Sequence, residues 1–358
     1  MASSLSWALG AADNIYYGMR LMGPARPLFF SEGWGDIPGS KIASDRVLAS
    51  LQDGQPPWKE SDHPEIMWED ACVICDGVMK RSAKFASPEA MLPSAARTAH
   101  FELVAPTEHS EHGDWPPTCS GVVVLLPATG EQSIWPRLHL AKQLARDDKL
   151  CSIILVAPFY GTRKPPGQPL HYITRVDYFL LQSVAILQEA AMLSIWALKT
   201  FPRAPVCISG FSWGAAMCAG AALLASQWRP AEAHRVGCSP YVGSASPAVM
   251  AAGMLNGDIC YDALVDKAQG EDAIACRQRL LSVLLDTHFD KFAARVTHPR
   301  LGCVEAVSCL DDHFVPAEWA QELFALLQGC CCKGRAHQQW IAGSHVTAFL
   351  RRGVQVGS

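Results

Sequence analysis

The feature that most constrains the fold is a regular alternation of short apolar runs with longer helix-like stretches, which begins at Gly121. The apolar runs have the length of buried strands, and the stretches between them have helical length and pattern. In order they are Val122–Leu126, Trp135–Arg146, Ile153–Ala157, Val176–Lys199 and Val206–Ser209. Because a chain that alternates strand and helix places its strands parallel, the sequence predicts an α/β fold with a mostly parallel central sheet flanked by helices.

The rest of the chain extends or interrupts this alternation. Residues 1–96 are irregular, with scattered Trp, Pro and Gly, and we interpret them as an N-terminal extension that packs on a core domain of residues 97–358. Residues 247–298 are helical in pattern and rich in Leu, Met and Ala, which predicts an inserted cap. Other expected elements are strands at Arg97–Ala105, Arg235–Val242, Val304–Leu310 and Gln338–Ile341, and helices at Ala215–Ala225 and Ala317–Leu327.

Composition excludes some classes of protein. The chain has 358 residues, of which 49% are hydrophobic, so it can bury a sizeable core. Lys and Arg total 30 against 34 Asp and Glu, a net charge of −4. The sequence has no basic stripe interleaved with aromatic residues, so we expect no nucleic-acid partner.

Fourteen cysteines raise the question of disulfides or metal. They are scattered, several lie inside apolar runs, and the sequence shows no secretory signal pattern, so we expect buried thiols in a protein that is intracellular, in the cytoplasm or in mitochondria, and not secreted. The Cys72–Cys75 pair has no second pair and no His at ligand spacing, so we expect no metal.

Two segments bear on membranes and targeting. Residues 1–27 contain one acidic residue and two arginines, which is compatible with a weak organellar presequence or with an N-terminal helix that packs on the body. The stretch Phe179–Leu198 is about as long as a membrane span, but it contains Gln182, Gln188 and Glu189. It also lies between two expected core strands, so we interpret it as a buried helix.

A serine motif follows one of the expected strands. Gly210–Gly214 matches G-x-S-x-G between an apolar strand and a small-residue helix, the context in which this motif forms a sharp turn that exposes its serine. We therefore expect Ser212 to be a nucleophile. The N–H of Trp213, at the positive end of the helix, is one expected donor to an oxyanion.

A serine nucleophile needs a base and an acid that orients the base, and in a strand–helix serine fold of this kind they follow it in the order acid, then histidine. Asp311 and Asp312 follow the strand at Val304–Leu310, and Asp312 fits a D-x-x-V-P pattern, which favours it over Asp311. His345 follows the last expected strand beside Gly343, which favours it as the base. His313 and His337 are the competing histidines.

Two further loops follow expected strands at the same edge of the sheet. The loop Leu126–Gly130 is small and ends in glycine, so we expect a second oxyanion donor from the N–H of Ala128 or Thr129. The loop Pro158–Pro165 carries Arg163 and Lys164, which are candidates for binding an anionic head group; solvated cations are the alternative.

The whole set of motifs resembles the family of α/β-hydrolase domain-containing protein eighteen over about residues 101–350. The stretch from Tyr160 to Pro165 is more specific for this family than the serine motif. The resemblance implies the α/β-hydrolase fold, a lipid-directed acyl hydrolase of possible mitochondrial residence, and triad positions at Ser212, Asp312 and His345. Members of that family usually carry a longer segment before the acid-bearing strand and a full helix after the histidine, so we expect the C-terminal packing to differ here.

These observations lead to one main functional hypothesis. We expect a serine hydrolase that cleaves a small-molecule or lipid ester through an acyl-enzyme, needs no metal or organic cofactor, and contacts a membrane peripherally if its substrate is a lipid. The apolar cap favours a groove for a long acyl chain; the alternative is that its side chains pack the cap onto the core. The alternatives are an acyltransferase with the same triad and a catalytically silent binding protein on the same fold. The oligomeric state is left open.

Overall fold

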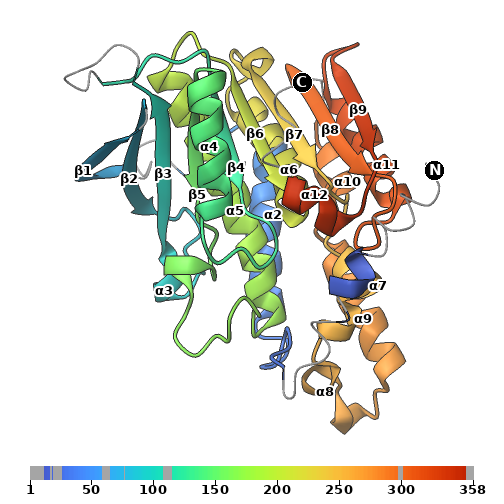
Figure 1. The fold of residues 1–358 in the computed structure, drawn as a ribbon. Coiled ribbons are helices and arrows are strands. Elements are labelled where there is room, and N and C mark those ends of the chain that lie inside the picture. The colour runs from blue at the N-terminus through green and yellow to red at the C-terminus, as the bar shows by residue number, and fades with distance from the viewer. Residues whose placement is uncertain are drawn as a thin grey trace.

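The structure is a computed structural model that describes residues 12–16, 18, 26–58, 65–75, 77–107, 115–296 and 301–351. Within these residues one nine-stranded sheet runs through the molecule in the order β1-β2-β3-β5-β4-β6-β7-β8-β9 (Figure 1). The pairs β1–β2, β2–β3 and β3–β5 are antiparallel, and the remaining pairs are parallel. The strands are β1 Met67–Cys75, β2 Val78–Ala86, β3 Thr98–Pro106, β4 Gly121–Leu126, β5 Leu150–Leu155, β6 Val206–Phe211, β7 Val236–Tyr241, β8 Cys303–Cys309 and β9 Ala336–Ile341.

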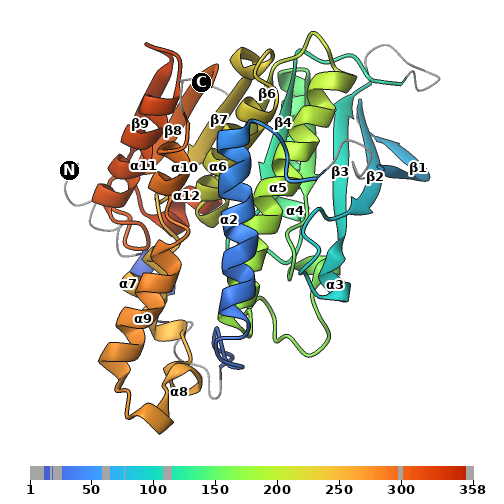
Figure 2. The same ribbon diagram turned by 180° about the vertical axis from the view of Figure 1, so that it is seen from behind.

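Helices cover both faces of the sheet, as the two opposite ribbon views show (Figures 1 and 2). The face seen in Figure 2 carries α2 Ile37–Asp53, α5 Val176–Thr200, α6 Trp213–Trp228 and α11 Ala317–Cys330. The face seen in Figure 1 carries α4 Trp135–Asp147 and α12 His345–Arg351. Short elements at α3 Ser94–Arg97, η2 Gly161–Arg163 and η3 Ala233–Arg235 complete the body. The architecture is therefore the predicted α/β sheet flanked by helices.

The central strands match the sequence prediction to within a few residues for a physical reason. Strands β4 and β5 are buried along nearly their whole length because helices cover both faces of the sheet there. A strand buried on both faces reads as a continuous apolar run, which is what Val122–Leu126 and Ile153–Ala157 are. The predicted cap is also helical, with α7 Val249–Ala252, η4 Met254–Asp258, α8 Tyr261–Leu264, η5 Lys267–Gln269, α9 Ala273–Leu285 and α10 Phe289–Ala293.

The N-terminal strands were not expected. The predicted first strand, Arg97–Ala105, is β3 and begins at Thr98, and β1 and β2 precede it as a hairpin in the same sheet. Strand β2 is only partly buried and mixes Lys and Arg with apolar residues, so it lacks the continuous apolar run that marks the central strands. The pair Asp76-Gly77 between the two strands is a hairpin signal in the sequence, and Gly77 has a φ of 72°.

Helix α5 lies in the core, as its polar residues indicated. Among the described residues it is the one helix long and apolar enough to cross a membrane, and 94% of its most apolar window is buried within the fold. Its polar side chains have partners inside the protein: Gln182 donates to the carbonyl of Pro158 at 2.7 Å, and Glu189 accepts from Arg163.

The turn between β6 and α6 is so closely packed that the glycines on either side of Ser212 have no space for a side chain. Ser212 connects the two elements with φ 57° and ψ −117°, a left-handed conformation that is strained for a residue with a Cβ. A Cβ added to Gly210 would lie 2.2 Å from the carbonyl oxygen of Gly214, and one added to Gly214 would lie 2.5 Å from that of Pro127. The backbones of β6, α6 and the loop after β4 therefore touch, and this contact sets where Ser212 stands.

A substitution at this contact should be costly. We expect Gly210→Ala to lower the free energy of unfolding by about 2 kcal/mol or more, because the added methyl group meets backbone that cannot move aside. Gly329→Ala in α11 is the matched control: nothing lies within 4 Å of its added Cβ, so the helix should gain about 0.5–1 kcal/mol. Urea unfolding of both variants measures this, and equal stabilities would show that the turn tolerates a side chain.

Candidate active site

The side chains of His345 and Asp312, the predicted base and acid, are hydrogen-bonded to each other. The Nδ1 atom of His345 lies 2.8 Å from Oδ2 of Asp312, and both side chains are largely buried. The other carboxylate oxygen of Asp312 accepts from the backbone N–H groups of Phe314 and Val315 at 2.8 and 2.7 Å. Because Nδ1 is engaged with Asp312, Nε2 is the ring nitrogen left for proton transfer.

Ser212 and His345 line one cavity of about 620 Å³, which brings the predicted nucleophile and the predicted base to the same space. The imidazole of His345 lies edge-on to the ring of Phe211, with centroids 5.0 Å apart, and is also in contact with Phe314 at 5.1 Å. The Ser212 hydroxyl makes no capping bond to α6, although Ser212 is its N-cap. The aromatic contacts restrain the imidazole ring of His345, and capping of α6 does not occupy the hydroxyl of Ser212.

The residues that compete for the roles of acid and base, Asp311, His313 and His337, have other surroundings. Asp311 donates its backbone N–H to the carbonyl of Gly343 at 3.1 Å, while the His345 ring bonds to its neighbour Asp312. His313 is exposed, and His337 is an exposed residue of β9 that lines a different cavity. The geometry therefore favours Asp312 and His345 over these three residues.

In the loop after β4, the two predicted oxyanion donors, Ala128 and Thr129, differ in their surroundings. The N–H of Ala128 donates to Oε2 of Glu131 at 3.2 Å, so it is already used within the loop. Glu131 is held in turn by Arg137, whose Nε lies 2.6 Å from Oε1, with both side chains 4% exposed. Thr129 lines both pockets that meet at Ser212. Of the two expected donors, Thr129 is therefore the remaining candidate, alongside the N–H of Trp213 at the first position of α6.

Two spaces meet at Ser212. The larger, of about 620 Å³, is lined mostly by apolar residues and lies within the size range of small-molecule sites. The smaller, of about 50 Å³, lies toward α5 and the cap and has room for only a few water-sized groups. Both are bordered by Thr129, Leu255 and Phe314. A bulky apolar part of a ligand would therefore have to occupy the larger space.

The N-terminal segment contributes to the larger cavity, which no sequence pattern indicated. Ala12, Ile15 and Tyr16 line it together with Phe29, although they precede the sheet. In Figures 1 and 2 this short helical segment, dark blue, lies beside α7 and close to α12. Asp13 within it bonds to the backbone at His313 and His345.

Arg163 does not reach the site, which corrects the expectation that it binds substrate. Its side chain is 0% exposed and forms two hydrogen bonds of 2.7 Å with Glu189 of α5. It also donates to the carbonyl groups of Ala96 and Val156. Through these contacts Arg163 links the loop after β5 to α5 and to α3, the short helix that precedes β3.

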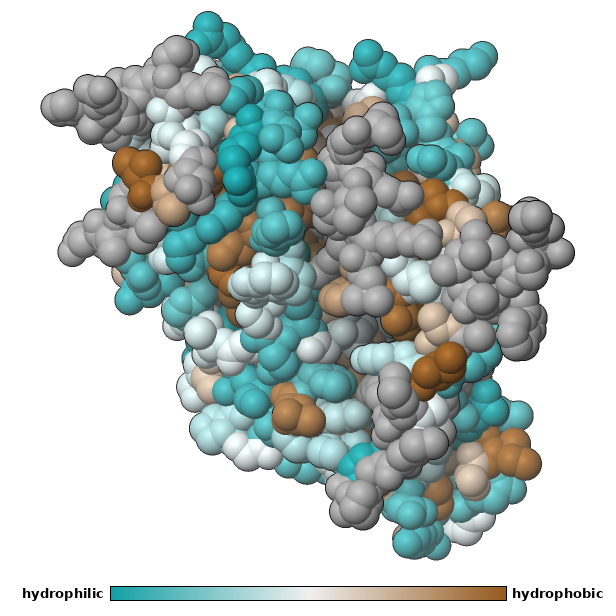
Figure 3. Space-filling model, in the orientation of Figure 1, coloured by the Kyte–Doolittle hydropathy of each residue, from teal (hydrophilic) through white to brown (hydrophobic). Residues whose placement is uncertain are grey.

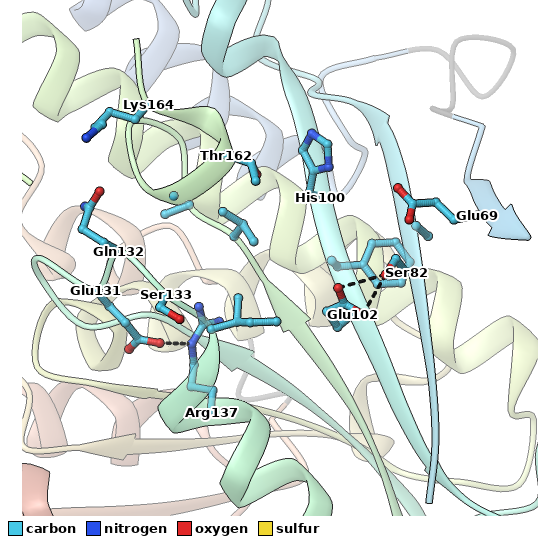
Figure 4. A pocket seen from close by; sticks show the side chains of 16 residues that line it. Glu69, Ser82, His100, Glu102, Glu131, Gln132, Ser133, Arg137, Thr162 and Lys164 are labelled. Atoms are coloured by element: carbon cyan, nitrogen blue, oxygen red, sulfur yellow. Dashed lines mark hydrogen bonds and ion pairs between the residues drawn. The ribbon is translucent and has the colours of Figure 1, made fainter. Parts of the chain in front are cut away.

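Lys164 lies beside another cavity, so it too is absent from the space that Ser212 lines. That cavity, of about 630 Å³, is polar and is lined by His100, Glu102 and Lys164 among others (Figure 4). Burial, and then the neighbouring Arg163 guanidinium, lower the pKa of His100, so its imidazole is neutral near pH 7. Glu102 is bonded to Ser82 at 2.9 Å. The expected pair of substrate-binding cations is therefore divided between the core and a separate cavity.

The apolar cap residues also divide. Leu280 and Leu284 of α9 are fully buried in the main core, and Leu285 is 44% exposed. Met250 lines the smaller pocket, and Leu255 lines both. Leu280 and Leu284 are therefore used in packing and do not line a groove. Leu255 is the cap residue in the wall of the larger cavity, which aromatic residues and the N-terminal segment otherwise form.

Solved structures that resemble this chain include three esterases, each of low sequence identity. Acetyl xylan esterase 1 from Thermoanaerobacterium sp. aligns with a TM-score of 0.55 at 12% identity, covering 92% of this chain and 97% of that one. A cold-adapted esterase from an Arctic intertidal metagenomic library gives 0.48 at 15%, covering 80% and 94%. The esterase rPPE gives 0.47 at 10%, covering 96% and 90%. The first of these likenesses shows that this chain and the acetyl xylan esterase share a fold.

Sequence comparison is more specific. The profile of the family described as alpha/beta hydrolase domain containing 18 matches residues 27–275. This range includes β1 to β7, Ser212 and the first part of the cap, and it ends before Asp312 and His345. Because it covers well over half of the sequence, the chain belongs to the alpha/beta hydrolase domain containing 18 family.

Proposed function

We propose that this protein is a serine hydrolase that cleaves carboxylic esters through an acyl-enzyme. The observation that carries the proposal is the 2.8 Å bond between His345 and Asp312 at a cavity that Ser212 also lines. A hydroxyl on a strained strand-to-helix turn, an imidazole and an orienting carboxylate are the parts that acyl transfer to serine requires. Membership of a hydrolase family and likeness to esterases point to the same class of reaction.

Each step of the reaction has a residue to perform it. His345 Nε2 removes the proton of Ser212 as Oγ attacks the ester carbonyl carbon, and Asp312 stabilises the imidazolium that results. The N–H groups of Trp213 and Thr129 hold the negative carbonyl oxygen. The imidazolium then protonates the departing alcohol, which leaves an acyl group on Ser212. Water, deprotonated by His345, attacks that acyl group and releases the acid. These steps need no metal or organic cofactor.

The substrate class follows from the shape of the two spaces at Ser212. A pocket of about 50 Å³ takes a small group, and the cavity of about 620 Å³ takes a long apolar one. Each methylene buried there contributes about 0.8 kcal/mol. We therefore propose an ester with a long acyl chain, phospholipids included, as the substrate class.

The surface around the larger cavity supports contact with a lipid surface. Ile15 and Tyr16 line the cavity and are still 59% and 43% exposed, so they stand at its mouth. In Figure 3, brown side chains are scattered among teal ones on the face of the molecule that carries α4 and α12. Exposed apolar side chains beside a substrate cavity favour peripheral contact with a membrane over binding from water alone.

The nucleophile can be tested directly. We expect Ser212→Ala to abolish labelling by a fluorophosphonate probe, because the attacking oxygen is gone. The far-UV circular dichroism should be unchanged, since one small atom is removed. Labelling that survives the substitution would place the nucleophile at another residue, and a wild-type protein that never reacts with the probe would favour a silent binding protein.

The tandem carboxylates allow a matched comparison. Asp312→Asn should lower kcat by about 10⁴-fold, because an amide no longer holds the imidazole in the required tautomer. Asp311→Asn, one residue away, should cost less than tenfold, since the His345 ring bonds to Asp312. Steady-state kinetics on one p-nitrophenyl ester decide the matter, and the reverse ranking would reassign the acid.

Chain length tests the substrate class. Four added methylenes inside the larger cavity should raise kcat/KM by about a hundredfold, because about 3 kcal/mol of burial is gained. The measurement is kcat/KM for p-nitrophenyl esters from two to twelve carbons, with and without an alcohol acceptor to detect acyl transfer. A profile that peaks at two carbons and then falls is incompatible with a long-chain cavity.

A further inference from the structure

A buried carboxylate near the N-terminus joins the two loops that carry the acid and the base. Asp13 is 0% exposed. Its Oδ2 accepts from the backbone N–H of His313 at 3.0 Å and from that of His345 at 3.2 Å, and its Oδ1 accepts from that of Val346 at 2.8 Å. These donors are separated from Asp13 by 300 to 333 residues of chain.

Such a charge is buried only where its bonds offset the cost. A carboxylate withdrawn from water is strongly destabilising unless donors surround it, and bonds to a charged acceptor are about twice as strong as neutral ones. The donors at His345 and Val346 belong to the first two positions of α12, where N–H groups have no partner within the helix. Asp13 is therefore a side-chain cap supplied by a distant segment.

One oxygen atom sets the spacing of the two loops. Oδ2 of Asp13 binds the residue that follows Asp312 and also the residue that carries the imidazole. The His345–Asp312 bond joins the same two loops through their side chains at 2.8 Å. The Asp13 carboxylate thus links the backbone of the loop that carries Asp312 to the backbone at His345.

We propose that Asp13 is a positioning residue that holds His345 and Asp312 in register for proton transfer, an inference that rests on the proposed function. It acts on the rate of the chemical step and not on the affinity for the ester, because its carboxylate bonds to backbone and does not line the cavity. A misplacement of about 1 Å at a reacting group can cost about a hundredfold in rate.

Other hydrogen bonds near the two loops do not involve Asp13, so we expect the fold to survive its substitution. The backbone N–H of Ser344 donates to Oγ1 of Thr347 at 2.7 Å at the start of α12. The N–H of Leu310 donates to the carbonyl of Ile341 at 3.0 Å, which joins the ends of β8 and β9. Removal of the Asp13 carboxylate should therefore loosen the two loops locally.

The test separates rate from folding. We expect Asp13→Ala to lower kcat for p-nitrophenyl butyrate 10- to 100-fold, expressed per active site titrated with a fluorophosphonate, with KM changed less than threefold. The rate constant for probe labelling should fall by a similar factor. Asp13→Asn keeps an oxygen for the two Oδ2 bonds and should fall between the wild type and Asp13→Ala; it also serves if the alanine variant does not fold. The control is Asp45→Ala, which removes an exposed carboxylate of α2 and should leave both constants unchanged.

The outcomes are distinct. An Asp13→Ala protein with wild-type kcat per titrated site, or one whose loss lies entirely in a smaller fraction of titratable sites, overturns the positioning role and leaves the proposed function intact. A wild-type protein that does not react with the probe overturns both.

Discussion

The contact between the β6–α6 turn and the loop after β4 is the constraint on which the rest of the site depends. An added Cβ at Gly214 would lie 2.5 Å from the carbonyl oxygen of Pro127, so the two segments touch through backbone alone. This contact places Ser212 in a left-handed conformation and sets the loop bearing Thr129 against it. One packing contact therefore holds both Ser212, the proposed nucleophile, and the loop of Thr129, the proposed oxyanion donor. The surrounding buried strands offset the backbone strain at Ser212.

Buried charged side chains hold the loops at the carboxyl edge of the sheet, whose conformations the strands alone do not determine. The Glu131–Arg137 pair fixes the loop after β4, the Arg163–Glu189 pair fixes the loop after β5, and Asp13 fixes the loops after β8 and β9. Glu131, Arg137, Arg163 and Asp13 also bond to backbone groups. Loops at the carboxyl edge of a parallel sheet are free to diverge, and a buried charge that binds two of them restores a single arrangement.

The sequence predicts the parts of this protein that have a local pattern. Strands β4 to β6 are buried on both faces and read as apolar runs, and Ser212 lies in a motif whose context is local. Strand β2 of the N-terminal hairpin is only partly buried and contains Lys and Arg, so it shows no continuous apolar run in the sequence. Asp13 and Arg163 depend on partners far along the chain, and no local pattern distinguishes a clamped carboxylate or a buried guanidinium from a solvated one. Motif order in the sequence suggested the residues of the proposed triad, but no local pattern suggested the buried groups that support them.

The most direct test of the account is the identity of the residue that carries the acyl group during turnover. The protein would be mixed with a p-nitrophenyl ester, quenched in acid within the first turnover and digested. The masses of its peptides would then be measured by mass spectrometry. The account predicts the mass of the acyl group on the peptide that contains Ser212, and its disappearance at long times as water releases the acid. Acyl mass on another residue, or product formed with no acylated peptide at any time, would contradict it.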